Sequence, residues 1–282
     1  MYEILYKEKL NDTVTRMDIY APDTARKALP GQFVILRCDE DGERIPLTVA
    51  GTDKSTGAVT VIFQRVGATT DKLDRKNTGD CLQDFVGPLG RPTELDGITR
   101  AAVVGGGVGC AIALPIARAL HEKGVQVDCI AGFRTKELVI LEKEFRACCD
   151  RFILMTDDGS AGEKGLVTDA LARRVAEGAG YDRVITIGPL VMMKFVCRLT
   201  KEYGIPTVAS MNPIMIDGTG MCGGCRLTVG GKTCFACVDG PDFDGHLIDF
   251  DEAIARSGMY REFEAAAREK NCNLFREANA HG

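Results

Sequence analysis

Apolar and polar positions alternate in short runs over the first 93 residues of the chain. These β-type runs cover residues 2–6, 14–20, 32–37, 46–50 and 58–65. Runs of period two that are bounded by Gly, Pro, Asn, Asp and Ser are typical of strands joined by tight turns. The pattern therefore predicts a small antiparallel β barrel at the start of the chain.

The rhythm changes near residue 98 to strand, glycine turn and helix. The predicted strands cover 101–104, 125–131, 152–156, 184–187 and 206–210, and a helix runs to Glu122. This alternation is typical of an α/β domain with a doubly wound parallel sheet. After Met211 the chain is rich in glycine and cysteine, and charged helical segments follow at 250–256 and 259–270. We expect four parts: barrel, α/β domain, small module and helical tail, with bounds 1–96, 97–210, 211–245 and 246–282.

Composition and charge narrow the class of protein. The 282 residues, 45% apolar and 27% charged, suit about two folded domains. The net charge is −5, and basic residues form no continuous stripe along the sequence, so we expect no nucleic-acid binding. The uncharged run 101–117 contains glycines and a proline and is shorter than the roughly 20 residues of a membrane span. Charged residues near the start argue against a signal peptide, so we expect no membrane association and a cytoplasmic location.

Four of the 12 cysteines fall close together: Cys222, Cys225, Cys234 and Cys237. Without an export signal, such a group is expected to bind a metal rather than to form disulfides. The few serines and histidines show no paired spacing, and segment 158–162 lacks the nucleophile-elbow pattern. The sequence therefore disfavours hydrolase chemistry, and we assign no catalytic acid, base or nucleophile.

A glycine-rich turn follows the first strand of the α/β domain and opens a helix. Its residues are Gly105, Gly106, Gly107, Val108 and Gly109. Bare backbone at a helix N-terminus can approach a pyrophosphate, although the same glycines also suit an ordinary tight turn. The motif predicts a nucleotide site without separating NAD from NADP.

The barrel carries two further segments that could bind an anion. Arg44 can grip a pyrophosphate, while Pro46 fixes the chain direction and Thr48 can hydrogen-bond a flat ring. Gly67 and Thr69 open a short helix through Leu73, which offers a second helix N-terminus. Two such segments suggest a dinucleotide, whereas a surface charge and an ordinary N-cap are the simpler interpretations of each alone.

The order of these motifs resembles the ferredoxin-NADP reductase superfamily, in the branch of dihydroorotate dehydrogenase electron-transfer subunits. The motifs that carry the resemblance lie at 30–33, 44–48, 67–70, 87–90, 105–109, 156–159 and 188–189. The resemblance implies an FAD site made by Arg44, Pro46, Leu47, Thr48, Gly67, Thr69 and Thr70. It implies a nicotinamide-nucleotide site made by Gly105, Gly106, Gly107, Val108, Gly109, Arg134, Asp158, Gly188 and Pro189. Ile112 and Ile187 depart from the usual proline and cysteine of that superfamily.

Arg134 and Asp158 also have simpler interpretations. Arg134 follows the second strand of the α/β domain, where it could meet a 2′-phosphate or be solvated in a loop. Asp158 precedes Gly159, and an aspartate there often serves turn and cap chemistry. These alternatives stay open at the level of the sequence.

The cysteine group admits two ligand sets. Cys222, Cys225, Cys234 and Cys237 could bind one zinc or one iron tetrahedrally. Alternatively, Asp217, Cys222, Cys225 and Cys237 follow the plant-type ferredoxin order with aspartate in its first place. Glycines at 218, 220, 223 and 224 favour the second set, because a loop around a cluster needs positive φ angles.

Resemblance decides between the two sets. Segment 217–225 is similar to the small subunits of electron-bifurcating NADH-dependent ferredoxin:NADP oxidoreductases, in which an aspartate is a ligand of a [2Fe-2S] cluster. The resemblance implies metal ligands Asp217, Cys222, Cys225 and Cys237, and leaves Cys234 as a free thiol.

These cofactors together predict an oxidoreductase subunit. A nicotinamide nucleotide transfers a two-electron hydride and an iron–sulfur cluster takes single electrons, so FAD must lie between NAD(H), or NADP(H), and the cluster. The counterpart of the cluster is expected on a larger flavin or iron–sulfur subunit, in a heterodimer. Met259, Tyr260, Phe263 and Ala267 recur at helical spacing, which suits either core packing or docking of that partner. Alternatives are an electron-transfer subunit of a dihydroorotate or sulfide dehydrogenase, and a nucleotide-sensing protein with a zinc site.

Overall fold

The N-terminal part is a nearly closed seven-stranded antiparallel barrel in a computed structural model that describes residues 1–260, 262–263 and 266. The strand order is β6-β1-β2-β5-β4-β3-β7. The strands are β1 (Tyr2–Lys9), β2 (Val14–Tyr20), β3 (Phe33–Arg37), β4 (Ile45–Asp53), β5 (Ala58–Gln64), β6 (Cys81–Leu82) and β7 (Asp84–Leu89), with helices α1 (Pro22–Lys27) and α2 (Ala68–Arg75) between them. The predicted barrel and its five strands are confirmed, whereas β6 and β7 were not predicted.

Alternation explains the barrel core. Ile4 of β1, Met17 and Ile19 of β2, and Val59 and Val61 of β5 are fully buried. Successive side chains of a strand point to opposite faces, so a period of two buries one face of each strand.

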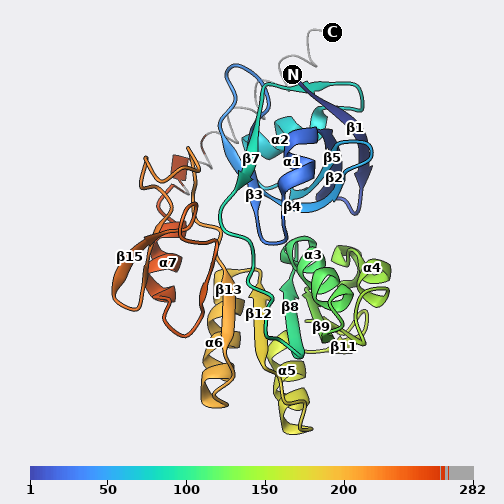
Figure 1. Cartoon of the computed structure of the whole chain (residues 1–282), viewed down its shortest axis with the longest axis vertical. Coiled ribbons are helices and arrows are strands. Elements are labelled where there is room, and N and C mark those ends of the chain that lie inside the picture. Colours follow the sequence, from blue (N-terminus) through green and yellow to red (C-terminus); the bar gives the residue numbers. More distant parts are fainter. Residues whose placement is uncertain (261, 264–265, 267–282) are drawn as a thin grey trace.

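The α/β domain is a parallel sheet of order β11-β10-β9-β8-β12-β13, with β16 added antiparallel at the β13 edge (Figure 1). Its strands are β8 (Arg100–Gly106), β9 (Gln126–Phe133), β10 (Arg151–Thr156), β11 (Glu163–Lys164), β12 (Arg183–Ile187) and β13 (Thr207–Ser210). Its helices are α3 (Gly109–Glu122), the 3-10 helix η1 (Lys136–Leu138), α4 (Glu142–Arg146), α5 (Val167–Ala176) and α6 (Leu190–Glu202). The chain order reverses beside β8, and such a switch point is where doubly wound sheets bind ligands.

One buried charge pair stabilises this sheet from within. Asp128 lies inside β9, accepts a 2.6 Å hydrogen bond from the Tyr181 hydroxyl, and lies 3.0 Å from the Arg174 guanidinium. Burial, followed by the hydrogen bond to Asp128, raises the pKa of Tyr181. Because all three side chains are buried and mutually paired, this group is structural.

The C-terminal module contains a small hairpin and a helix. Its elements are β14 (Arg226–Val229), β15 (Lys232–Phe235), β16 (Asp242–Asp244) and α7 (Phe250–Ser257). The helix predicted at 250–256 is confirmed by α7, whereas the helix predicted at 259–270 lies largely outside the described residues, as does Ala267. Since β16 pairs with β13, the module is joined to the α/β sheet, and the predicted bounds 211–245 and 246–282 stay predictions.

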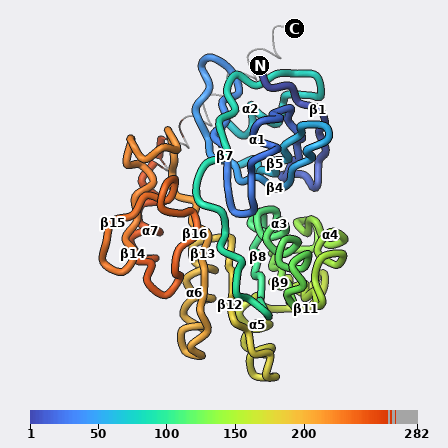
Figure 2. Tube along the Cα trace, in the orientation of Figure 1, coloured from blue at the N-terminus to red at the C-terminus, as the bar shows by residue number. Residues whose placement is uncertain are grey.

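The barrel packs against both other parts of the molecule (Figure 2). Ala50 and Ile62 of the barrel share an apolar core with Ala111 and Leu114 of α3. Phe33 and Ile35 of β3 share another with residues of the module, including Cys225 and Cys237. The barrel thus contacts the α/β domain through one face and the cysteine-bearing module through another.

Candidate functional site

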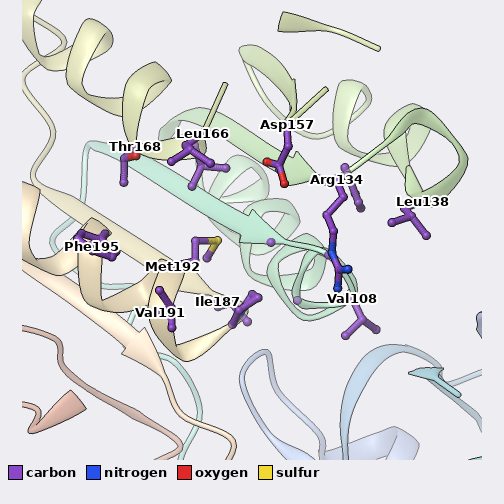
Figure 3. Close-up of a pocket in the computed structure, with 18 of the residues that line it drawn as sticks. Val108, Arg134, Leu138, Asp157, Leu166, Thr168, Ile187, Val191, Met192 and Phe195 are labelled. Atoms are coloured by element: carbon purple, nitrogen blue, oxygen red, sulfur yellow. The ribbon is translucent and has the colours of Figure 1, made fainter. Parts of the chain in front are cut away.

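A cavity of about 910 Å³ opens at the carboxyl ends of the parallel strands (Figure 3). Helices α3, α5 and α6 border it, together with the barrel turn between β1 and β2. Of the residues predicted for the nucleotide site, it brings together Gly106, Gly107, Val108, Gly109, Arg134, Gly188 and Pro189. A concave site at a topological switch point suits a dinucleotide.

The glycines of this turn serve different physical needs. A Cβ on Gly109 would lie 2.5 Å from the Ile187 carbonyl oxygen, so this glycine allows α3 to approach β12. A Cβ on Gly105 would lie 2.8 Å from Cys110 Sγ, and one on Gly106 would lie 2.4 Å from Met192 Sδ. Gly107 has no such neighbour, and its φ of +55° identifies it as the conformational glycine of the turn.

One end of the cavity carries charges. Figure 3 shows the Arg134 side chain extending toward Val108, with Asp157 nearby. Asp157 lines the cavity, whereas the predicted Asp158 does not. Asp158 instead accepts hydrogen bonds of 2.9 and 2.6 Å from the Ser160 amide and hydroxyl, which lower its pKa. Asp158 thus makes turn-forming contacts, its assignment to the nucleotide stays a prediction, and Asp157 lines the cavity.

The predicted flavin segment lies on and beside β4. Pro46, Leu47 and Thr48 are half-buried and pair with Ile35, Val34 and Phe33 of β3. Arg44 directly precedes β4, and its guanidinium lies 3.4 Å from Asp84 Oδ2. Arg37 Nε lies 2.7 Å from the same oxygen, so one carboxylate is shared between two guanidinium groups.

The second predicted anion segment lies beside the first. Thr69 Oγ1 donates a 2.8 Å hydrogen bond to Glu43 Oε2, which joins the start of α2 to the residue before Arg44. Thr70 Oγ1 accepts bonds of 2.9 and 3.0 Å from the Val66 and Gly67 amides. Tertiary structure thus brings the two barrel segments together, while Thr70 is engaged in shaping the turn.

The predicted metal ligands form two close pairs. Asp217 Oδ1 lies 3.2 Å from Cys222 Sγ, and Cys225 Sγ lies 3.3 Å from Cys237 Sγ. No group of three or more His, Cys, Asp or Glu side chains is assembled for a single ion among the described residues. Two ligand pairs fit a cluster of two irons, each held by its own pair, better than they fit one tetrahedral ion. The four residues therefore suit an iron–sulfur cluster, and the barrel segments around Arg44 and Thr69 suit FAD.

Backbone and hydrogen bonding support the ligand loop. Positive φ angles were predicted for its glycines and are confirmed at Gly218, Gly220 and Gly223, but not at Gly224. Burial alone would raise the pKa of Asp217, but hydrogen bonds from Cys222, Met221 and Thr219 lower it to about 2. The amides of Thr219 and Met221 and the Thr219 hydroxyl thus hold this carboxylate in place at the start of the predicted ligand loop.

Cys234 belongs to β15, where it pairs in register with Leu227 of β14. It is half-buried and packs against apolar residues of the module. No hydrogen-bond contact joins it to Cys222, Cys225 or Cys237 in the described part of the chain.

Several cavity residues gave no signal in the sequence. Asn11, Thr13 and Gln64 contribute from the barrel, and Ser210 and Asn212 from the end of β13. Asn11 Nδ2 also donates a 3.3 Å hydrogen bond to the Leu138 carbonyl across the interface between the barrel and the α/β domain. Polar residues in turns have no distinctive spacing, so only the fold could place them beside the cavity.

An antiparallel barrel joined to a parallel sheet with this cavity defines the class of ferredoxin-reductase-like proteins, here with a cysteine-bearing module added. The chain belongs to the family of dihydroorotate dehydrogenase B electron-transfer subunits and their homologues. It is 46% identical to the protein named dihydroorotate dehydrogenase B (NAD(+)) electron transfer subunit homolog of Thermotoga maritima, over 95% of this chain and 94% of that one. It is 36% identical to the electron transfer subunit from Geobacillus thermodenitrificans, over 76% and 84% of the two chains.

Two further comparisons agree with this family. Residues 212–249 match the iron-sulfur cluster binding domain of dihydroorotate dehydrogenase B. A chain of the NADH-dependent reduced ferredoxin-NADP oxidoreductase, solved in a study of flavin-based electron bifurcation, is 44% identical. It superimposes with a TM-score of 0.91 over 96% of this chain and 98% of that one. The predicted fold, family and class of iron–sulfur flavoprotein oxidoreductase subunit are confirmed.

None of the described helices combines the length and apolar composition needed to cross a bilayer.

Proposed function

We propose that this chain is the smaller subunit of an electron-bifurcating NADH-dependent reduced ferredoxin-NADP oxidoreductase. It passes electrons between NAD(H), FAD and a [2Fe-2S] cluster, to or from a larger flavin and iron–sulfur subunit. The sequence identity of 44% over nearly the whole of both chains supports this assignment. We assign FAD binding to residues 1–96, nucleotide binding to 97–210 and cluster binding to 211–245. We also propose that the protein works in the cytoplasm.

The observation that carries the proposal is the packing of the cluster loop on the barrel. A Cβ on Gly218 would lie 2.8 Å from Leu89 Cδ1 and 2.9 Å from Ile35 Cγ1. Gly218 therefore packs against barrel strands β3 and β7, and Asp217 directly precedes it in sequence. Since Pro46, Leu47 and Thr48 of β4 pair with β3, the flavin segment and the cluster loop both contact strand β3.

When bound, FAD exchanges a hydride with a nicotinamide nucleotide and single electrons with an iron–sulfur cluster. The chain's own residues arrange this exchange. Arg44 and the start of α2 hold the pyrophosphate of FAD, and the turn 105–109 holds that of the nucleotide. Asp217, Cys222, Cys225 and Cys237 hold the cluster.

The larger subunit docks, in this proposal, over the exposed end of the cluster loop. Cys222 is exposed, whereas Cys225 and Cys237 are 1% exposed, so the pair with Asp217 faces outward. Met221 is 89% exposed and Ile216 is 55% exposed beside it. Large exposed apolar side chains around a ligand loop are typical of an interaction surface. Met259 and Phe263, whose helical spacing suits partner docking, are also exposed.

Anaerobic purification of the complex tests this function. The chain should copurify with a larger subunit, contain FAD and two irons, and lose its flavin absorbance when NADH is added. A colourless chain that contains one zinc would overturn the proposal. Oxidation of dihydroorotate with NAD(+) as the electron acceptor, in place of electron exchange with ferredoxin and NADP, would instead favour the second candidate, a dihydroorotate dehydrogenase subunit, which the 36% identity supports.

A further inference from the structure

Two arginines donate hydrogen bonds to the backbone between two cluster ligands. Arg226 Nη1 lies 3.4 Å from the Gly223 carbonyl oxygen, and Arg256 Nη2 lies 3.3 Å from that of Gly224. These glycines are the two residues that separate Cys222 from Cys225. The backbone that connects one ligand pair to the other is thus held by guanidinium groups from two elements, β14 and α7.

A third arginine holds the backbone beside the remaining cysteine. Arg91 Nε donates a 3.1 Å hydrogen bond to the carbonyl of Val238, which directly follows Cys237. Arg91 belongs to the segment between β7 and β8, and its own amide donates a 2.7 Å bond to the Gly240 carbonyl. Contacts from distant parts of the sequence therefore meet on both ligand segments.

The charges of these arginines are only partly compensated. Arg91 Nη2 lies 3.8 Å from Asp239, and its side chain is 69% exposed. Within the described residues, neither Arg226 nor Arg256 has a carboxylate oxygen within ion-pair distance. The three groups thus place net positive charge around a loop whose ligands are one carboxylate and three thiolates.

We propose that Arg91, Arg226 and Arg256 form a cationic clamp that restrains the ligand segments and raises the reduction potential of the cluster. The inference rests on the proposed function only in requiring an iron–sulfur cluster at these ligands. Uptake of one electron adds one negative charge, and nearby fixed positive charges stabilise that added charge. Charge-assisted hydrogen bonds also hold the backbone more strongly than neutral ones.

The test separates charge from hydrogen bonding at each position. Arg226→Gln and Arg256→Gln remove the charge, whereas Arg226→Lys and Arg256→Lys keep it but lose the guanidinium fork. Arg146→Gln is the matched control, because Arg146 pairs with Glu142 on α4, on the other side of the molecule (Figure 1). The midpoint potential is measured by a dithionite titration followed by paramagnetic resonance, and the rate of iron loss by challenge with a chelator.

Both Gln variants should have a lower midpoint potential than the wild type, and the double variant should be lower still. The Lys variants should keep a potential near the wild-type value but lose iron faster, and Arg146→Gln should change neither quantity. If a Gln variant loses its iron during purification, the restraint by the clamp is supported, and Arg91→Gln, at a position whose side chain is 69% exposed, then decides the effect of charge. Wild-type potentials in Gln variants that retain their cluster would overturn the inference alone, whereas absence of any cluster from the wild type would overturn the proposed function.

Discussion

Thr93 Oγ1 donates a 2.6 Å hydrogen bond to Asp242 Oδ2, although 149 residues separate the two in sequence. Thr93 lies between the barrel and the α/β domain, and Asp242 begins β16. Thr93 is buried, and Asp242 is half-buried with its Oδ1 atom enclosed by protein. Burial raises the pKa of Asp242 above its ordinary value, against the opposing effects of Thr93 and Ser210. This carboxyl group therefore joins the segment between the barrel and the α/β domain to strand β16.

Asp242→Asn should be more stable than the wild type, and the difference in unfolding free energy should increase as the pH rises. Because the folded-state pKa is raised, folding favours the protonated acid, so the wild type loses stability as pH rises from about 3.8 through the folded pKa. Asparagine stays neutral, can still accept from Thr93, and avoids this loss. We expect a gain of about 1–3 kcal/mol at the alkaline end, measured by chemical unfolding from pH 4 to pH 8. A difference in stability that is constant over this range would contradict a raised pKa.

Arg44→Ala should release FAD and leave the iron content unchanged. A charge-assisted hydrogen bond contributes about 1.5–3 kcal/mol, so the dissociation constant for FAD should rise roughly 10- to 150-fold. Flavin and iron are quantified after gel filtration. Arg26→Ala is the control, because Arg26 is exposed on α1 and pairs with Asp23. Full retention of flavin by folded Arg44→Ala would refute its assignment to the pyrophosphate.

Cys234→Ser and Asp217→Cys distinguish the two ligand sets. If Asp217 is a ligand, Cys234→Ser should keep both irons and the visible spectrum, because its thiol is not bonded to iron. Asp217→Cys should keep a [2Fe-2S] cluster with a shifted potential and resonance signal, since a fourth thiolate is softer than a carboxylate. Loss of metal in Cys234→Ser, together with an unchanged metal content and spectrum in Asp217→Cys, would support the four-cysteine site instead.

Gly109→Ala should weaken both the fold and nucleotide binding. Its Cβ would lie 2.5 Å from the Ile187 carbonyl oxygen, so α3 must move away from β12. We expect a loss of about 1–3 kcal/mol in unfolding free energy, with weaker NADH binding measured by titration. Gly51→Ala is the matched control, because its Cβ would make only ordinary contacts, at 3.5 Å and beyond, with Thr60. Equal stability of the two variants would show that the approach of α3 to β12 does not require glycine.

Periodicity predicted the large elements correctly, because burial of one face acts locally on each strand and helix. The period of two located β1 to β5, and the strand–turn–helix rhythm located β8, α3, β9 and β12. Two-residue elements such as β6 and β11 are too short to show a period, and β6 forms only by pairing with β1, a strand distant in sequence. β16 is another case, since its edge position depends on β13.

The chemical motifs were readable because phosphate binding and metal ligation require particular residues at short spacings. The glycine turn 105–109 and the spacing of Asp217, Cys222, Cys225 and Cys237 are of this kind. Tertiary structure alone brought Cys225 Sγ to 3.3 Å from Cys237 Sγ, joined the barrel segments through Glu43 and Thr69, and placed Asn11 of the barrel beside the cavity. These contacts depend on how distant backbones pack, which no local pattern of residues records.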